Sequence, residues 1–379
     1  MTEPASANPA PPPPSAPPPP SLTPAPPGAS QPAAAPSERG WGKLLLALAA
    51  FLFVPAIPQV RAILPVEQTM VLFVPAVAAC ALVGWWAGGR AFLAIAWVAI
   101  AVLMTIPSAS STDAFYNLTR GWSLLLAGSF GLVCLFSSAR PLFARALLAL
   151  GITLVLALIM SLTGPVTVSR ASKTVADEFA RRNAETMATV TAVIQAHPQE
   201  WQQLAAKVPQ LAQLPQETGK ELTVLSDAGA AVFPAILALE SLAALALAWA
   251  TYHRLGRARL GAPLHPLRDF RFNDQLVWGL IVGLTIMLLP TLVTVRGAGK
   301  NLLVFFGALY AVRGLGVLSW FMAPGSLGIT LAVGLVMLLA PVLNVVAVLA
   351  FMLVGVAALA LGLGDTWADW RSRPRSTTP

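Results

Sequence analysis

Long apolar stretches, separated by short polar breaks, occupy the sequence from Trp41 to Leu363. A helix needs about 20 apolar residues to cross a bilayer, because each residue advances it by about 1.5 Å. About ten stretches meet this length when the last one is divided near Pro341, and about nine spans are the alternative. The predicted spans are residues 42–60, 68–88, 91–107, 115–137, 142–164, 230–252, 277–295, 301–322, 325–340 and 343–363. The sequence therefore predicts an all-α, polytopic transmembrane helix bundle.

The composition excludes a soluble protein of this length. Hydrophobic residues make up 56% of the 379 residues and charged residues only 11%, whereas soluble proteins are about 25% charged. The chain has two cysteines, which excludes a disulfide-based fold. Arginines in the predicted cytoplasmic loops explain the net charge of +8, so nucleic acid is not an expected partner.

The chain divides into five parts by composition. The first 40 residues are rich in proline and alanine and lack apolar periodicity, which predicts a disordered tail. A long polar segment also interrupts the apolar pattern. The predicted parts are the tail at 1–40, the first spans at 41–165, an insertion at 166–229, the remaining spans at 230–364 and a C-terminal tail at 365–379.

Loop charges predict the orientation. Lysine and arginine gather in alternate short loops, which the positive-inside rule assigns to the cytoplasm. Both termini are then cytoplasmic, in a cell (inner) membrane, and residues 166–229 are extracytoplasmic. Val175, Phe179 and Met187 recur there at helical spacing, which predicts a small helical cap over the outer face, as a lid, a docking surface or a structural insertion.

Charged residues inside spans are costly in a bilayer and are therefore candidates for function. Glu240 and Arg313 lie near the middle of their spans, Arg120 lies near the outer end of its span, and Tyr310 shares a helix face with Arg313. We expect Glu240 and Arg313 to face each other, either as a polar substrate site or as a structural ion pair. With two arginines and one glutamate, a binding site would favour a neutral or anionic solute.

A Gly-x-Gly-Asp string at Gly362, Gly364 and Asp365 matches intramembrane aspartyl proteases. That chemistry needs a second aspartate that shares a proton. Asp369, one turn further on, belongs with Asp365 to a predicted solvated helix end. No catalytic or metal-ligating constellation and no P-loop is present, so we expect neither an enzyme nor a bound cofactor.

Four motifs in the C-terminal half carry a resemblance. They are Arg271-Phe-Asn-Asp274-Gln-Leu-Val-Trp278, Asn301-Leu-Leu-Val, Tyr310-Ala-Val-Arg313-Gly-Leu-Gly-Val and Gly364-Asp365-Thr-Trp367-Ala-Asp369-Trp-Arg371. The chain resembles the YybS-like family of bacterial multi-pass membrane proteins over roughly 41–375. That family is distantly similar to the substrate-binding S components of energy-coupling-factor transporters, so the resemblance implies a membrane-embedded solute-binding protein.

Two functions remain open at this point. The first is a substrate-binding membrane component of small-solute uptake without its own ATPase, with Glu240, Tyr310, Arg313 and Arg120 as its site. The second is a non-catalytic envelope scaffold. The expected partners are the lipid bilayer and other membrane or transporter subunits.

Overall fold

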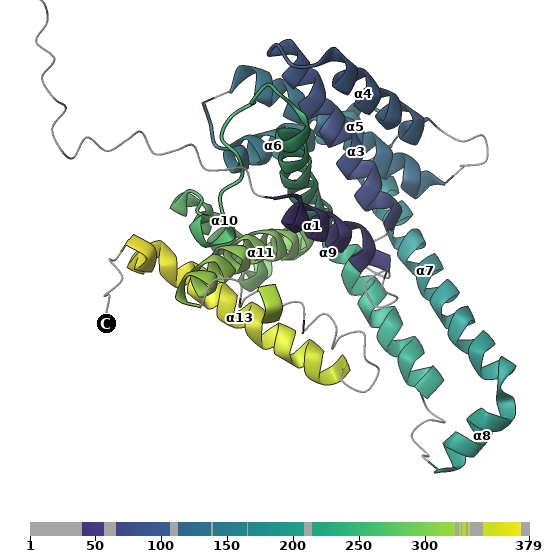
Figure 1. The fold of residues 1–379 in the computed structure, drawn as a ribbon. Helices are drawn as coiled ribbons and strands as arrows, with labels where there is room; N and C mark the ends of the chain where they lie inside the picture. The colour runs from purple at the N-terminus through teal and green to yellow at the C-terminus, as the bar shows by residue number, and fades with distance from the viewer. Residues whose placement is uncertain are drawn as a thin grey trace, which may run out of the picture. The chain divides into compact units, whose positions relative to one another are not determined.

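Figure 1 shows the fold of the chain in a computed structural model. The residues that the structure describes are 40–56, 66–106, 113–137, 139–164, 166–207, 214–322, 326, 328–330, 333 and 344–372. Their regular elements are helical, without a strand. The predicted tail, apart from Gly40, and most of the predicted span 325–340 lie outside the described residues.

The helices follow the predicted apolar stretches closely. They are α1 (Trp41–Phe53), α3 (Val66–Trp86), α4 (Ala91–Thr105), α5 (Ala114–Phe136), α6 (Leu142–Thr163), α7 (Val168–Ala196), α8 (Pro198–Lys207), α9 (Leu214–Leu255), α10 (Val277–Leu288), α11 (Arg296–Phe321) and α13 (Asn344–Ala368). Within the described ranges, five helical segments are long and apolar enough to cross a membrane, and four apolar ones are shorter. This confirms the helical membrane class, whereas the count of about ten spans is not shown.

One predicted span is shorter than expected. Residues 277–295 do not form one helix, because α10 ends at Leu288 and a 3₁₀ segment from Pro290 to Val295 leads into α11. Pro290 explains the break, since the residue before a proline avoids helical geometry.

Helices α3, α5 and α9 form the centre of the described core and run parallel to one another. Contacting pairs advance together along each pair of helices: Phe115–Phe233, Trp122–Ser241 and Phe130–Trp249 join α5 to α9, and Val71–Ser123 and Ala79–Gly131 join α3 to α5. These helices are the second, fourth and sixth predicted spans. Successive spans cross a membrane in alternating directions, so every second span should run the same way. These contacting pairs therefore show which residues of α3, α5 and α9 lie at the same height along the three helices.

A proline inside α3 is compensated by a neighbouring helix. Pro75 has no N–H and leaves the carbonyl of Val71 without its helical partner. The Ser123 hydroxyl, from α5, donates to that carbonyl. In a bilayer such a replacement is required, because no water is available to satisfy the freed group.

A second proline, Pro234 in α9, is compensated by an inserted side chain. The Asn301 amide from α11 accepts from the Ala235 N–H at 2.9 Å and donates to the Ala231 carbonyl at 2.9 Å. These two groups would otherwise bond to each other within the helix. Asn301 thus enters the helical hydrogen-bond ladder of α9 and ties α11 to it.

The predicted insertion is helical, as expected, and forms a hairpin. Helix α7 lies beside the first half of α9, with α8 at the far end of the pair (Figure 1). Helix α9 continues through residue 230 without interruption, so the insertion and the next span share one helix. The hairpin projects from the bundle (Figure 1), and its position over the outer face stays a prediction.

The base of this hairpin packs on the bundle. Phe233 of α9 contacts both Phe115 of α5 and Phe179 of α7. Beside this aromatic contact, the buried Glu178 carboxylate accepts from Arg181 and Arg182. The hydrogen bond to Glu178 raises the pKa of the Arg181 guanidinium above its ordinary value.

Candidate functional site

A layer of buried polar side chains crosses the apolar core at one level of α3, α5 and α9. We call these residues the polar layer: Gln68, Thr69, Thr119, Ser123, Glu240 and Ser241. The register of the three parallel helices places them together, since Ser123 contacts Val71 and Trp122 contacts Ser241. Buried polar groups in a membrane protein interior are candidates for function.

Glu240 and Gln68 make the central contact of the polar layer. The Gln68 Nε2 donates to Glu240 Oε2 at 2.6 Å. Both side chains are buried, with 2% of Gln68 and 7% of Glu240 exposed. The other oxygen of each side chain, Oε1, is also buried and has no hydrogen-bond partner among the described residues. The layer therefore holds two acceptor oxygens with unused capacity.

The neighbouring hydroxyl groups have protein partners. Ser241 accepts from the Trp122 indole at 2.9 Å and donates to the Leu237 carbonyl at 2.7 Å. Thr119 donates to the Phe115 carbonyl at 3.2 Å, and Ser123 is bound to α3. The unused hydrogen-bonding capacity of these polar side chains is therefore concentrated on Gln68 and Glu240.

Arg120 belongs to the same level of the core. Ser123 contacts Val71 and Gly131 contacts Ala79, so residue 120 of α5 is level with Gln68 of α3. The Nη1 atom of Arg120 is buried and has no hydrogen-bond partner among the described residues. A donor with unused capacity thus lies at the level of the two acceptor oxygens.

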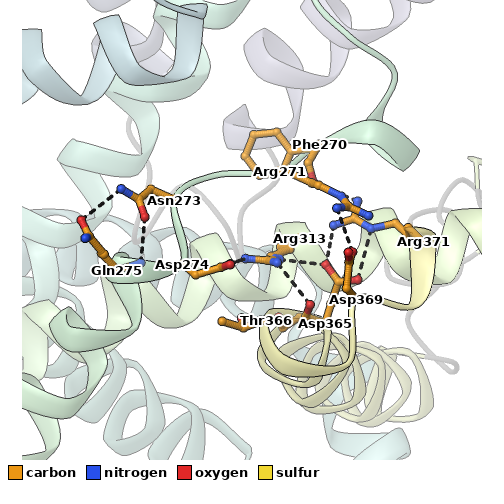
Figure 2. Close-up of polar contacts among 11 residues, drawn as sticks. Phe270, Arg271, Asn273, Asp274, Gln275, Arg313, Asp365, Thr366, Asp369 and Arg371 are labelled. Carbon is orange, nitrogen blue, oxygen red and sulfur yellow. Dashed lines mark hydrogen bonds and ion pairs between the residues drawn. The ribbon is translucent and has the colours of Figure 1, made fainter. Parts of the chain in front are cut away.

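The expected ion pair between Glu240 and Arg313 is not formed, and that prediction is wrong. Arg313 of α11 instead binds Asp274 through Nη1 at 2.5 Å and Asp365 of α13 through Nε at 3.0 Å (Figure 2). Glu240 bonds to Gln68. Glu240 and Arg313 lie on the contacting helices α9 and α11. Glu240 points toward α3, however, and Arg313 points toward α13.

Arg371 completes a cluster around Asp365, which we call the carboxylate clasp: Asp274, Arg313, Asp365 and Arg371. Arg371 Nη2 lies 2.6 Å from Asp365 Oδ2, and its Nη1 donates to the carbonyls of Arg268 and Phe270 at 2.9 Å each (Figure 2). The clasp therefore joins α11, α13, the 267–274 loop and the C-terminal turn.

Burial of the clasp corrects the prediction of a solvated helix end at Asp365. This residue is 1% exposed, and two arginines bind its carboxylate. Asp369 makes a separate, half-exposed ion pair with Arg271 at 2.8 Å. A carboxylate held by two guanidinium groups stays ionised and does not share a proton with a second aspartate, so the clasp is a structural device.

Tyr310 lies with Arg313, as their spacing predicts, and both side chains contact Phe272. The Phe272 ring packs edge-on against Tyr310, with ring centroids 5.0 Å apart. The Arg313 guanidinium lies 5.3 Å from the centroid of the same Phe272 ring. The four candidate residues from the sequence thus divide into Arg120 and Glu240 at the polar layer and Tyr310 and Arg313 at the clasp.

Sequence reasoning missed several residues of these sites, among them Gln68, Asp274 and Asp365. Gln68 is an uncharged amide near the start of an apolar stretch, so the rule that selects charges passes over it. Asp274 and Asp365 fall at predicted span ends, where charges are ordinary. The signal for both was their place in the C-terminal motifs. In the described part of the chain, no group of three or more histidine, cysteine, aspartate or glutamate residues could hold a metal ion.

The long apolar helices, with a polar layer and an ionic clasp buried between them, define a helical integral membrane protein. The chain belongs to the family described as "Predicted membrane protein (DUF2232)", whose model matches residues 47–359. No curated protein and no solved structure matches the chain.

Proposed function

We propose that this protein binds a small polar solute at the polar layer, as a membrane-embedded binding component of solute uptake that has no ATPase of its own. This proposal agrees with the resemblance to the YybS-like family and, through it, to the S components of energy-coupling-factor transporters. Its partners would be the lipid bilayer and the transporter subunits that supply the energy.

One observation carries the proposal. Gln68 Oε1 and Glu240 Oε1 are buried in an apolar core without hydrogen-bond partners. Leaving a buried acceptor unsatisfied costs about 1–3 kcal/mol, and more for a charged group. A bound solute that donates to both oxygens would remove this cost. Binding sites of small molecules have this character, with a few convergent polar groups in apolar surroundings.

The experiment is mass spectrometry of the small molecules released from gently purified protein. We expect the wild-type protein to release a solute that Glu240→Gln lacks, because the variant cannot offer the carboxylate. Ser129→Ala is the matched control, since Ser129 lies on α5 with a buried hydroxyl that also has no partner in the described structure. Identical molecules from all three proteins, or none, would remove the support for a binding site.

A scaffold role is the second candidate, and the α7–α9 hairpin is the observation that favours it. The hairpin carries α8 at its far end and extends from the bundle (Figure 1). A projecting helical pair offers side surfaces for partner proteins. Co-purification of envelope proteins with the wild type, lost on removal of residues 180–220, would favour this role over solute binding.

The orientation proposed with this function has cytoplasmic termini in the cell membrane and an extracytoplasmic hairpin. The loop charges support it. We expect a cysteine placed at the exposed Ser172 to react with an impermeant thiol reagent in intact cells and one placed at Ser376 to be protected. The native Cys80 and Cys134 are buried and give a low background. Labelling at Ser376 alone would invert the orientation.

A further inference from the structure

We infer that the solute of the polar layer is a zwitterion, whose cationic group is received by Glu240 and Gln68 and whose anionic group is received by Arg120. This inference rests on the proposed function and names its substrate class. It starts from three buried atoms that have no hydrogen-bond partner in the described structure: Gln68 Oε1, Glu240 Oε1 and Arg120 Nη1.

The three atoms have opposite requirements. The two oxygens accept hydrogen bonds, and the guanidinium nitrogen donates them. The acceptors are on α3 and α9, and the donor is on α5 at the level of Gln68. A solute that satisfies all three must present a donor group to the two oxygens and an acceptor group to the guanidinium nitrogen.

The acidic and basic side chains of the layer favour a solute with charged groups over a neutral polar solute. Arg120 is basic and Glu240 is acidic, so Glu240 becomes a full negative charge when a cationic group meets it, and neither side chain has an ion-pair partner in the described structure. A simple cation would leave Arg120 without a counter-charge, and a simple anion would leave the acceptor oxygens of Glu240 and Gln68 without a donor. Buried charges without partners are strongly unfavourable in a membrane interior.

The position of Arg313 changes the expected charge of the solute. Counting Arg313 with Arg120 against Glu240 favoured a neutral or anionic solute. Asp274 and Asp365 bind Arg313 in the clasp, however, so its charge is neutralised there. The layer itself is left with one acidic and one basic side chain, Glu240 and Arg120, which match an amine and a carboxylate in one molecule.

The test is thermal unfolding of the purified wild-type protein with each common amino acid and two ω-amino acids, β-alanine and γ-aminobutyrate, as probes. A solute that binds the folded state raises the melting temperature in proportion to the logarithm of its concentration over Kd. The best probe is then compared with its methyl ester, which lacks the anionic group, and its N-acetyl derivative, which lacks the cationic group. We expect each derivative to bind at least about tenfold more weakly.

Two variants test the two charged groups of the solute one at a time. We expect Glu240→Gln and Arg120→Gln each to weaken the best probe at least about tenfold, because each removes one charged partner. Ser129→Ala should bind it as the wild type does. In Glu240→Gln the N-acetyl derivative should bind about as tightly as the parent probe, because the variant has no carboxylate for the cationic group of the parent probe.

Three outcomes would overturn the inference. If a singly charged or neutral derivative binds as tightly as the zwitterion and still depends on Glu240, the zwitterion class is wrong while solute binding stands. The same holds if mass spectrometry identifies a released solute without opposite charges. If no probe raises the melting temperature and no solute is released, both the inference and the proposed function fail.

Discussion

Replacing Asp365 with asparagine is expected to lower the free energy of unfolding by about 3–5 kcal/mol, because it leaves two buried guanidinium groups without their shared negative charge. Asp365 binds both Arg313 and Arg371, whose side chains are 4% and 3% exposed. The exposed Asp274 cannot replace it at Arg371, since its own carboxylate binds Arg313. Unfolding in mixed micelles by titration with a denaturing detergent measures the loss.

Asp369→Asn is the matched control for this prediction. It removes the same charge one helical turn away, from an ion pair with Arg271 that is half-exposed. Exposed pairs contribute about 0–1 kcal/mol, so this variant should stay close to the wild type. Equal losses in the two variants would show that the carboxylate clasp does not hold the C-terminal helices together.

Replacing Gly362 with alanine is expected to force α13 away from α11 and to lower the free energy of unfolding by about 2–3 kcal/mol. The added methyl group would overlap the carbonyl oxygen of Tyr310. Gly314, on the other helix, faces the carbonyl oxygen of Ala358 in the same way. The contact is between backbone atoms and not flexible side chains, so the added methyl group can be accommodated only if the two helices move apart. Small residues allow such close approach in membrane bundles.

Gly355→Ala provides the control on the same helix. A methyl group there meets nothing within 4 Å, so the substitution keeps the helix contact and gains helix propensity, about 1 kcal/mol. The detergent titration should therefore rank Gly355→Ala at or above the wild type and Gly362→Ala well below it. Equal stability of the two variants would mean that α11 and α13 do not pack backbone to backbone.

Some of this architecture could be predicted because it depends on local sequence. The apolar length of a stretch is a local property, so α3, α5, α6 and α9 appear where hydropathy places them. The cost of an intramembrane charge is also local, so the sequence alone singles out Arg120, Glu240 and Arg313 as residues that need an explanation.

The partners of these charges could not be predicted, because they depend on how non-adjacent helices rotate and cross. Glu240 meets Gln68 across 172 residues of sequence, and Arg313 meets Asp365 across 52. Hydropathy gives the depth of a residue in a span but not the direction in which its side chain points. Equal depth therefore suggested a pair between Glu240 and Arg313 that the packing of α9 and α11 does not make.

Asp365 shows a related difficulty. A charge at a span end followed by arginines is typical of a solvated boundary. In the structure the chain turns back after Asp369, which adopts a left-handed conformation with a φ of 39°, and a short 3₁₀ turn at Trp370–Ser372 follows. This turn brings Arg371 onto Asp365 and buries both side chains. A reversal of this kind depends on a few residues whose tertiary contacts the sequence pattern does not reveal.

We propose that the polar layer holds a solute between Gln68, Arg120 and Glu240. An experimental structure of the gently purified protein in lipid nanodiscs tests it most directly. We expect density for a small molecule within hydrogen-bond distance of Gln68 Oε1 and Glu240 Oε1, with its other end at the Arg120 guanidinium. A direct ion pair between Arg120 and Glu240, with no density between them, would contradict it.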